Sequence, residues 1–132
     1  MTSAPGMIIF PATESDARRV VRFAARYRIR VVGKCSGHDS MMRSTGYGVI
    51  QLVMTKFKSI SFNNATQTIT FGAGNAHLDV YSFLAEKGRF AVGGTWAYVC
   101  PAGCLSNGCY GHFTREFGMG ADNVAGLRFM LY

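Results

Sequence analysis

The sequence predicts an α+β fold, and the order of its patterns leads to this prediction. The first part alternates β-branched runs with one amphipathic helical pattern, whereas the later part holds hairpin-like strands and glycine-rich loops. Such an order is typical of α+β domains. The composition is that of a folded chain, because 48% of the 132 residues are hydrophobic and 16% are charged. A length of 132 residues favours one domain.

The chain opens with a predicted strand and a predicted helix. Residues 7–10 form a short apolar run between two prolines, which favours a strand. Thr13 is a good N-cap for a helix over about 14–27, with acidic residues in its first turn. The apolar face of that helix holds Ala17, Val20, Val21, Ala24 and Ala25. This spacing predicts a helix that packs one side against a core.

Four further strands are predicted by short runs rich in β-branched and aromatic residues. These runs are 29–32, 49–53, 60–62 and 68–71. The loop Lys-Cys-Ser-Gly-His-Asp-Ser, residues 34–40, follows the first of them. Asn63-Asn64 separates the last two and is a turn signal, so we expect an antiparallel pair there.

The rest of the chain predicts a helix, a short strand and a long glycine-rich segment. Helical periodicity runs from Leu78 to Glu86, and Lys87-Gly88 is a suitable C-cap. We expect a strand over 90–92 and a helix inside the glycine-rich segment. An apolar strand begins at 127–132, where it has no neighbour to pair with, so we expect the chain to be part of something larger.

The net charge of +7 comes partly from arginines gathered in the first third of the chain. A solvated helix face is the favoured interpretation, because no nucleic-acid-binding motif accompanies the charge, and we do not expect nucleic acid as a partner. Nucleic-acid binding stays a third hypothesis that predicts a steep loss of affinity with salt. The sequence contains neither a signal peptide nor a membrane span, and it leaves localisation open.

The glycine-rich segment, residues 93–124, is the feature around which the chain is organised. Glycine is used where the backbone takes a positive φ or lies close to another group. The segment therefore favours loops that lie against a cofactor. It lacks the Gly-Lys-Ser/Thr ending of a phosphate loop. Its seven glycines are Gly93, Gly94, Gly103, Gly108, Gly111, Gly118 and Gly120.

Four ordered blocks of this sequence resemble the FAD-binding domain of the vanillyl-alcohol oxidase and p-cresol methylhydroxylase (PCMH) family, with berberine-bridge-enzyme-like FAD-linked oxidases most similar. The blocks are KCSGHDS, the GAG before the second helix, the segment from Gly93 to Gly111, and REFGMGADNV. The resemblance runs from about Pro11 to Tyr132. It implies an FAD-binding domain over 1–132 that is the N-terminal portion of a two-lobed PCMH-type fold, truncated at its C-terminal end, with the substrate domain absent.

The first block resembles the family loop that wraps the FAD pyrophosphate through backbone N–H groups. The resemblance places Lys34, Cys35, Ser36, Gly37, His38 and Asp39 in this loop. Small residues after a strand let several N–H groups converge on an anion. The family's histidine is often bonded to the flavin, so the resemblance makes His38 the candidate covalent anchor and leaves mono-covalent and non-covalent attachment of FAD both open. The alternative is a histidine in an ordinary surface loop.

The third and fourth blocks are implied to face the flavin and its ribityl chain. The implied contacts are Gly94, Thr95, Val99, Gly103, Gly108 and Asn123. Trp96 stands where bicovalent relatives have a second flavin-linking cysteine, so a second bond is not expected. Cys100, Asn107 and Cys109 replace family glycines, and each adds a Cβ. For the Asp-Asn pair at 122–123 an ordinary turn is an equally available interpretation.

The resemblance implies an FAD-dependent oxidoreductase that accepts a hydride from an alcohol, sugar, amine or phenolic substrate. No catalytic residue is assigned, and the fragment alone is expected to be inactive. The alternative is a degenerate or truncated non-catalytic module that binds metal or an anionic partner. Its support is the cluster of Cys100, Cys104, Cys109 and His112, although the spacing lacks a CxxC pair and buried inert cysteines are favoured.

Overall fold

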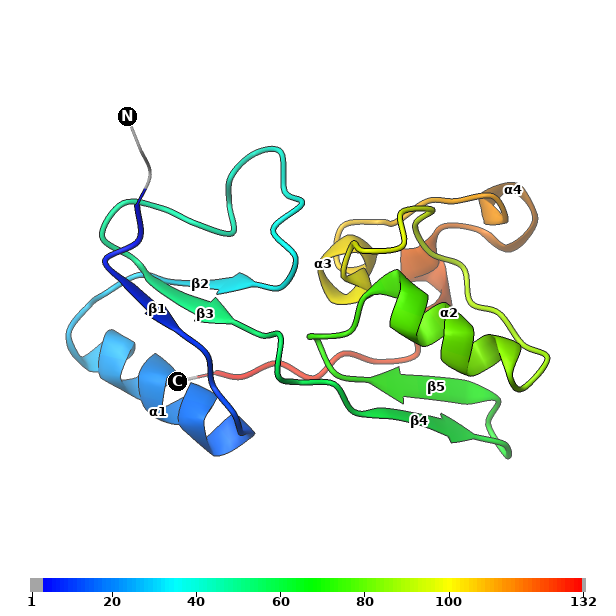
Figure 1. The fold of residues 1–132 in the computed structure, drawn as a ribbon, viewed down its shortest axis with the longest axis horizontal. Helices are drawn as coiled ribbons and strands as arrows, with labels where there is room; N and C mark the ends of the chain where they lie inside the picture. The colour runs from blue at the N-terminus through cyan, green and yellow to red at the C-terminus, as the bar shows by residue number, and fades with distance from the viewer. Residues whose placement is uncertain (1–3, 132) are drawn as a thin grey trace. The chain divides into compact units, whose positions relative to one another are not determined.

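The computed structural model describes residues 4–131, which fall into two compact units (Figure 1). The first unit comprises the chain up to Phe57 together with the segment from Arg128. The second unit comprises Lys58–Leu127. Each unit has its own sheet, parallel in the first and antiparallel in the second. The α+β prediction is thereby confirmed.

The first unit is a three-stranded parallel sheet with one helix. Its elements are β1 (Met7–Ile9), α1 (Glu14–Arg26), β2 (Val31–Lys34) and β3 (Ile50–Val53). The strand order is β1-β3-β2, so β3 is central, and all four of its residues are buried. A central parallel strand buries both faces, which explains why residues 49–53 are an almost continuous apolar run.

Helix α1 begins as the sequence predicts. The Thr13 hydroxyl accepts a hydrogen bond from the Asp16 N–H at 3.1 Å, and the Asp16 carboxylate accepts one from the Thr13 N–H at 3.0 Å. This capping box pairs two N–H groups that the helix itself leaves free. Ala17 and Ala24 are buried, and Val20 and Val21 are half-buried, which confirms most of the predicted apolar face, whereas Ala25 is exposed. The end of the unit returns to this helix, where Arg128 forms an ion pair with Glu14.

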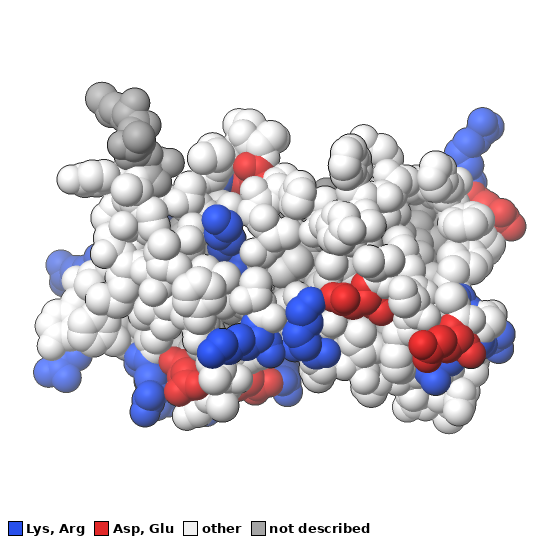
Figure 2. Space-filling model, viewed as in Figure 1, with Lys and Arg blue, Asp and Glu red and all other residues white. Residues whose placement is uncertain are grey.

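The arginines of α1 point to solvent, as the interpretation of a solvated face predicts. Arg18, Arg19, Arg22 and Arg26 are all exposed. Arg19 pairs with Asp16 on the same helix at 3.4 Å. On the face drawn in Figure 2, basic and acidic side chains are interspersed and form no continuous basic surface. Among the described residues, no helix is both long and apolar enough to cross a membrane.

The second unit contains a hairpin, one longer helix and a glycine-rich segment with short helices (Figure 1). The Asn63 side-chain oxygen accepts hydrogen bonds from the N–H groups of Ala65 and Thr66, which confirms the predicted turn. The hairpin register pairs Ile60 with Phe71. The elements are β4 (Ile60–Asn63), β5 (Thr68–Phe71), α2 (His77–Ala85), α3 (Pro101–Leu105), α4 (Thr114–Phe117) and the 3₁₀ helix η1 (Gly120–Asn123).

Helix α2 supplies the core of the second unit. Val80 and Leu84 are each 2% exposed. At its start the Asp79 carboxylate accepts the Ala76 N–H at 2.8 Å and pairs with Lys58 at 2.6 Å. These two contacts hold the pKa of Asp79 below its ordinary value, the bond from Lys58 contributing most. Gly88 follows the helix with a φ of +63°, which confirms the predicted C-cap.

Two predicted strands do not form among the described residues. Residues 90–92 and 127–131 have no regular structure, and Tyr132 lies outside the described residues. A run of apolar residues becomes a strand only where another strand offers its N–H and C=O groups. The described part of the chain offers neither run such a neighbour. The helix predicted inside the glycine-rich segment is confirmed by α3.

Candidate cofactor site

The loop that follows β2 turns at Gly37. Gly37 has a φ of +80°, in the left-handed region that glycine adopts without strain. A Cβ on Gly37 would come within 2.8 Å of Cε of Lys34. The side chain of Lys34 therefore lies directly over the turn, and its ammonium group adds positive charge to it. Gly37 and His38 are both exposed.

The N–H groups of Gly37 and His38 are open to a ligand. Among the described residues, neither N–H donates a hydrogen bond. Adjacent exposed donors beside a lysine fit the recognition of a phosphate group. The imidazole of His38 is exposed on the same turn. The first unit therefore brings Lys34, Gly37 and His38 together, as the first block predicts.

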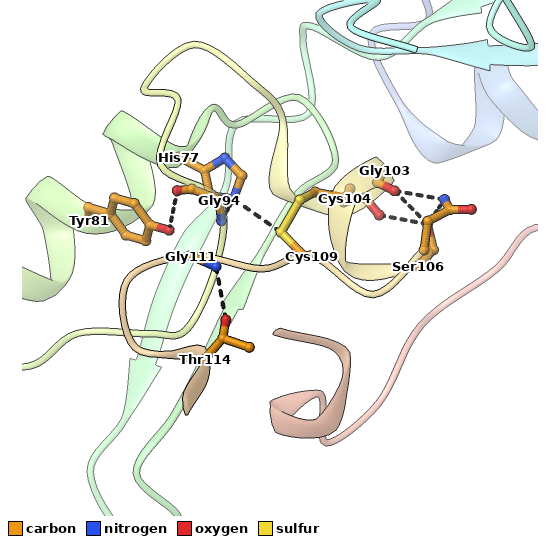
Figure 3. The surroundings of a disulfide bond; sticks show 11 residues. His77, Tyr81, Gly94, Gly103, Cys104, Ser106, Cys109, Gly111 and Thr114 are labelled. Atoms are coloured by element: carbon orange, nitrogen blue, oxygen red, sulfur yellow. Dashed lines mark hydrogen bonds between the residues drawn. A yellow bond between two sulfur atoms is a disulfide. The ribbon is translucent and has the colours of Figure 1, made fainter. Parts of the chain in front are cut away.

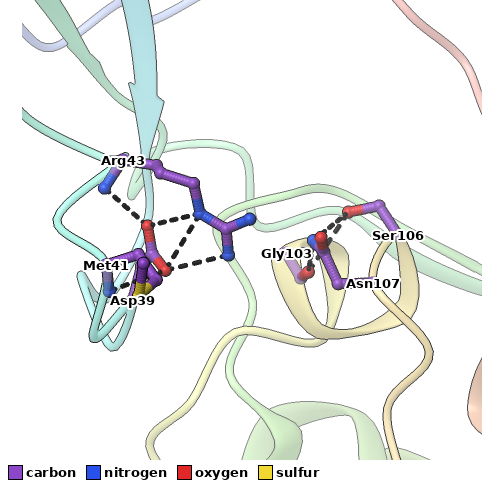
Figure 4. Close-up of polar contacts among 6 residues, drawn as sticks. All are labelled: Asp39, Met41, Arg43, Gly103, Ser106 and Asn107. Atoms are coloured by element: carbon purple, nitrogen blue, oxygen red, sulfur yellow. Dashed lines mark hydrogen bonds and ion pairs between the residues drawn. The ribbon is translucent and has the colours of Figure 1, made fainter.

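Asp39 shapes this loop with its own side chain (Figure 4). Its carboxylate accepts the Arg43 N–H at 2.6 Å and the Met41 N–H at 3.3 Å. It also pairs with the Arg43 guanidinium at 2.9 Å. The side-chain hydrogen bond from Arg43 is the main reason why the pKa of Asp39 is lowered. The carboxylate is therefore engaged within the chain, and the Asp39 side chain holds the loop in shape.

In the second unit, helix α2 holds the Gly-Gly-Thr sequence of the glycine-rich segment (Figure 3). The Gly94 N–H donates to Nε2 of His77 at 3.1 Å, and the Tyr81 hydroxyl donates to the Gly94 carbonyl at 2.8 Å. A Cβ on Gly94 would lie 3.6 Å from Sγ of Cys104, so Gly94 also lies beside α3. Thr95 is exposed.

The glycines of this segment differ in what surrounds them. A Cβ at Gly111 would lie 2.1 Å from the Gly93 carbonyl oxygen, so packing within the chain already requires glycine there. At Gly103, which is exposed on α3, a Cβ would meet no described atom within 4 Å. No contact of the described chain explains the glycine at 103. Its open surface fits a group that approaches the backbone from outside, as a flavin would.

The remaining predicted residues are engaged within the chain. The Val99 carbonyl accepts the His77 N–H at 2.9 Å. Gly108 has a φ of +108°. The Asn123 amide donates to the carbonyls of Phe117 and Met119 at 2.9 Å each, so its side chain holds a turn. The ordinary-turn interpretation of the Asp-Asn pair accounts for every contact of the Asn123 side chain that the structure describes.

The residues that replace family glycines have defined conformations. Cys109 has a φ of +60°, which is a glycine-like conformation on a residue with a Cβ. Asn107 donates its amide to the Gly103 carbonyl at 2.9 Å (Figure 4). The backbone at 109 has thus kept the shape that a glycine allows.

The prediction of buried inert cysteines is right about the burial of Cys100 and Cys109 but did not include a disulfide. Cys104 and Cys109 form a disulfide, and none of the cysteines is free (Figure 3). The spacing gave no sign of the bond, because the two cysteines are five residues apart and meet only where the chain turns back after α3. The ligand atoms of His77, Cys104 and Cys109 lie within 4.8 Å of one another. This group contains His77, whereas the predicted cluster contained His112. The sulfurs of Cys104 and Cys109 are bonded to each other.

Sequence reasoning did not identify His77 and Tyr81. His77 is 1% exposed, and burial lowers the pKa of its imidazole, which favours the neutral form. Burial likewise raises the pKa of Tyr81. Their spacing of four residues on a helix puts both on one face. That spacing was visible in the sequence, but nothing marked that face as the one that meets Gly94.

Comparisons with known proteins agree on one family. The family described as FAD binding domain matches residues 5–132. The FAD-linked oxidoreductase apf9 of Gibberella fujikuroi is 32% identical over 98% of this chain and 25% of its own length. The FAD-linked oxidoreductase patO of Aspergillus clavatus is 34% identical over 92% of this chain and 23% of its own length.

A solved structure supports the same assignment. The 6-hydroxy-D-nicotine oxidase of Arthrobacter nicotinovorans has a TM-score of 0.86 and 25% identity, covering 92% of this chain and 27% of that one. The chain thus spans about a quarter of the length of the curated relatives it matches. Because the family match takes in nearly all of the described residues, the chain belongs to the FAD binding domain family.

Proposed function

We propose that this FAD-binding domain binds the FAD cofactor of an oxidoreductase. The observation that carries the proposal is the turn at Gly37 and His38, where two open N–H groups lie beside Lys34. Donors of this kind suit the FAD pyrophosphate, which carries negative charge along its whole length. We assign the pyrophosphate contacts to Lys34, Cys35, Ser36, Gly37, His38 and Asp39.

The glycine-rich segment is assigned to the flavin and the ribityl chain. Gly103 supports this assignment best, because its exposed surface has no neighbour among the described atoms. A Cβ on Gly94 would lie 3.6 Å from Sγ of Cys104, which belongs to the same short helix as Gly103. The full set assigned here is Gly94, Thr95, Val99, Gly103, Gly108 and Asn123, the last as the residue that holds the adjoining turn.

FAD supplies the chemistry of hydride acceptance, and the protein supplies orientation and charge. The substrate of the whole protein is proposed to be an alcohol, a sugar, an amine or a phenol, in line with the family that the sequence resembles. The comparisons lend no support to the alternative of a metal-binding or anion-binding module. In addition, two of the three cysteine sulfurs in its proposed cluster are bonded to each other.

His38 is proposed as the covalent anchor of the flavin. Its imidazole is exposed on the turn assigned to the pyrophosphate, and a neutral imidazole is a competent nucleophile. Its bond to a flavin methyl carbon would replace a C–H bond, releasing one proton and leaving two electrons on the flavin, which O2 would accept. Trp96 cannot form a thioether, so a single bond through His38 is expected. A single attachment through one residue gives a simple test, because removing that residue must release all of the flavin.

Acid precipitation of the protein expressed with FAD tests both parts of the proposal. We expect flavin absorbance in the pellet of the wild-type chain and in the supernatant after His38→Ala. His112→Ala is the matched control, because His112 is also an exposed histidine, and it should leave the flavin in the pellet. Flavin in the wild-type supernatant would refute the covalent anchor but keep the FAD site. Protein without flavin would refute the site itself.

A further inference from the structure

The imidazole of His77 is the most deeply buried polar ring that the structure describes in the second unit. It begins α2, is 1% exposed, and lies against the ring of Tyr81 with centroids 5.3 Å apart (Figure 3). Its Nε2 lies 3.8 Å from Sγ of Cys109. A polar ring loses hydrogen bonds to water when it is buried, so its contacts inside the protein decide whether it is tolerated.

The two rings of α2 bind both polar groups of one peptide residue. Nε2 of His77 accepts the Gly94 N–H at 3.1 Å, and the Tyr81 hydroxyl donates to the Gly94 carbonyl at 2.8 Å. Because Nε2 acts as an acceptor, the hydrogen of the neutral ring is assigned to Nδ1. Both contacts come from one helix face, since the residues are four apart. Gly94 is therefore fixed by a single rigid element.

The rings pack closely against the backbone of Gly93 and Gly94. A Cβ on Gly93 would lie 2.6 Å from the Tyr81 hydroxyl oxygen and 3.1 Å from Nε2 of His77. A Cβ on Gly94 would lie 3.0 Å from Cε1 of His77. A Cβ at either glycine would thus be in close contact with the rings of α2. This contact explains both glycines without any ligand.

We propose that His77 and Tyr81 are positioning residues, which hold the Gly93–Thr95 backbone in the conformation that FAD meets. The proposal rests on the function proposed above. The Cys104–Cys109 disulfide completes the arrangement, because its Cys109 sulfur packs against the same imidazole nitrogen. A loop fixed before binding saves the cost of ordering it when the ligand arrives. The two rings therefore affect FAD affinity without touching the flavin.

FAD titration of His77 variants tests the proposal, with every variant made in the His38→Ala background so that binding of FAD stays reversible. His77→Leu removes the acceptor and leaves the Gly94 N–H unpaired, so we expect the Kd for FAD to rise at least about tenfold. His77→Gln offers an amide oxygen close to the place of Nε2 and should restore most of the affinity. Tyr81→Phe loses only the bond to the Gly94 carbonyl and should raise the Kd by about threefold to tenfold.

A general loss of stability needs a separate control. Val80→Ala removes buried volume from the same helix without removing a contact to Gly94, so it should lower the unfolding midpoint and leave the Kd unchanged. Tyr27→Phe, on the exposed ring of Tyr27 after α1, is the matched control for Tyr81→Phe and should change nothing. If Val80→Ala weakens FAD as much as His77→Leu does, the positioning role is refuted.

Amide hydrogen exchange of Gly94 in the FAD-free chain separates this proposal from the proposed function. We expect a protected Gly94 N–H in the wild type, fast exchange in His77→Leu, and protection again in His77→Gln. If the Gly94 N–H exchanges at the same rate in the wild type, His77→Leu and His77→Gln, the proposal is overturned, whether or not the chain binds FAD. If Gly94 behaves as expected but the wild type binds no FAD, the proposed function fails and the contact stands as structural. If His77→Leu does not fold, the proposal is tested by comparing the Kd for FAD of Tyr81→Phe with that of Tyr27→Phe. Equal Kd values would refute the positioning role.

Discussion

The carbonyl oxygen of Gly93 lies so close to Gly111 that a Cβ at 111 would stand 2.1 Å from it. The neighbour is backbone, which cannot rotate away as a side chain does. The Gly111 N–H also donates to the Thr114 hydroxyl at 2.9 Å, which ties the start of α4 to the same place. The backbone at Gly93 and the backbone at Gly111 are thus in close contact. Residue 111 has room for the hydrogen of a glycine but not for a Cβ.

Gly111→Ala is expected to destabilise the second unit strongly. The added methyl must move one of two backbone segments, and overpacking of this kind costs about 3 kcal/mol or more. Urea unfolding followed by circular dichroism measures the change. Gly126→Ala is the control, because a Cβ there meets nothing within 4 Å, and it should stay within about 0.5 kcal/mol of the wild type. Equal stability of the two variants would contradict the close contact.

Gly103→Ala should separate stability from cofactor binding. The position lies in α3 and is open, so alanine should leave stability unchanged or raise it by up to about 1 kcal/mol. If the flavin lies against this backbone, the added methyl group keeps the two apart, and the Kd for FAD should rise about tenfold. Calorimetric titration of FAD into the two proteins gives the answer. An unchanged Kd would remove Gly103 from the proposed site.

Acid should destabilise the fold through His77. Burial lowers the pKa of this imidazole in the folded protein, whereas the unfolded chain keeps an ordinary pKa of about 6.5. Below that pH the His77 imidazole is protonated in the unfolded state, whereas in the folded state it stays neutral until the pH approaches its lowered pKa. Stability is therefore complete above about pH 6.5 and falls as the pH drops, by up to about 1.4 kcal/mol per pH unit until the folded pKa is reached.

The pH dependence is measured by urea unfolding at several pH values between about 8 and 5, the range that spans the ordinary histidine pKa. His77→Gln should flatten the fall, because glutamine does not titrate. His112→Gln should keep it, because that histidine is exposed. A wild-type profile that matches the His77→Gln profile would show that His77 binds its proton equally well in both states.

The Cys104–Cys109 disulfide should stabilise the chain by about 2 kcal/mol, as expected for closing so short a loop. Peptide mapping with and without reduction should find these two residues linked. Of two disulfide-free variants, Cys104→Ala/Cys109→Gly should be more stable than Cys104→Ala/Cys109→Ala by about 1 kcal/mol, because residue 109 has a φ of +60°. Equal stability would mean that this φ does not survive without the bond.

Local patterns made most of the fold predictable. Thr13 with Asp16 indicated the start of α1, and Asn63-Asn64 indicated the hairpin, because both depend on neighbours within a few residues. The strand over 90–92 was wrongly predicted because strand formation depends on a distant partner. Apolar character alone does not supply that partner.

The cofactor family was recognisable from ordered blocks, but the internal supports of the site were not. The sequence showed the two glycines at 93 and 94. It did not show that the rings of His77 and Tyr81, 17 and 13 residues before Gly94, pack against them. The disulfide was missed for a related reason, since only the turn after α3 brings Cys109 back to Cys104. These are contacts between segments, and a single sequence carries no signal of them.

Titration of the FAD-free chain with FAD, followed by flavin fluorescence and visible absorbance, tests the central claim most directly. We predict saturable binding of one FAD per chain, with a shift of the flavin spectrum, and a loss of affinity as salt rises because Lys34 attracts the pyrophosphate. Riboflavin, which lacks the pyrophosphate, should bind far more weakly. Absence of saturable binding by a chain that unfolds cooperatively would contradict the account.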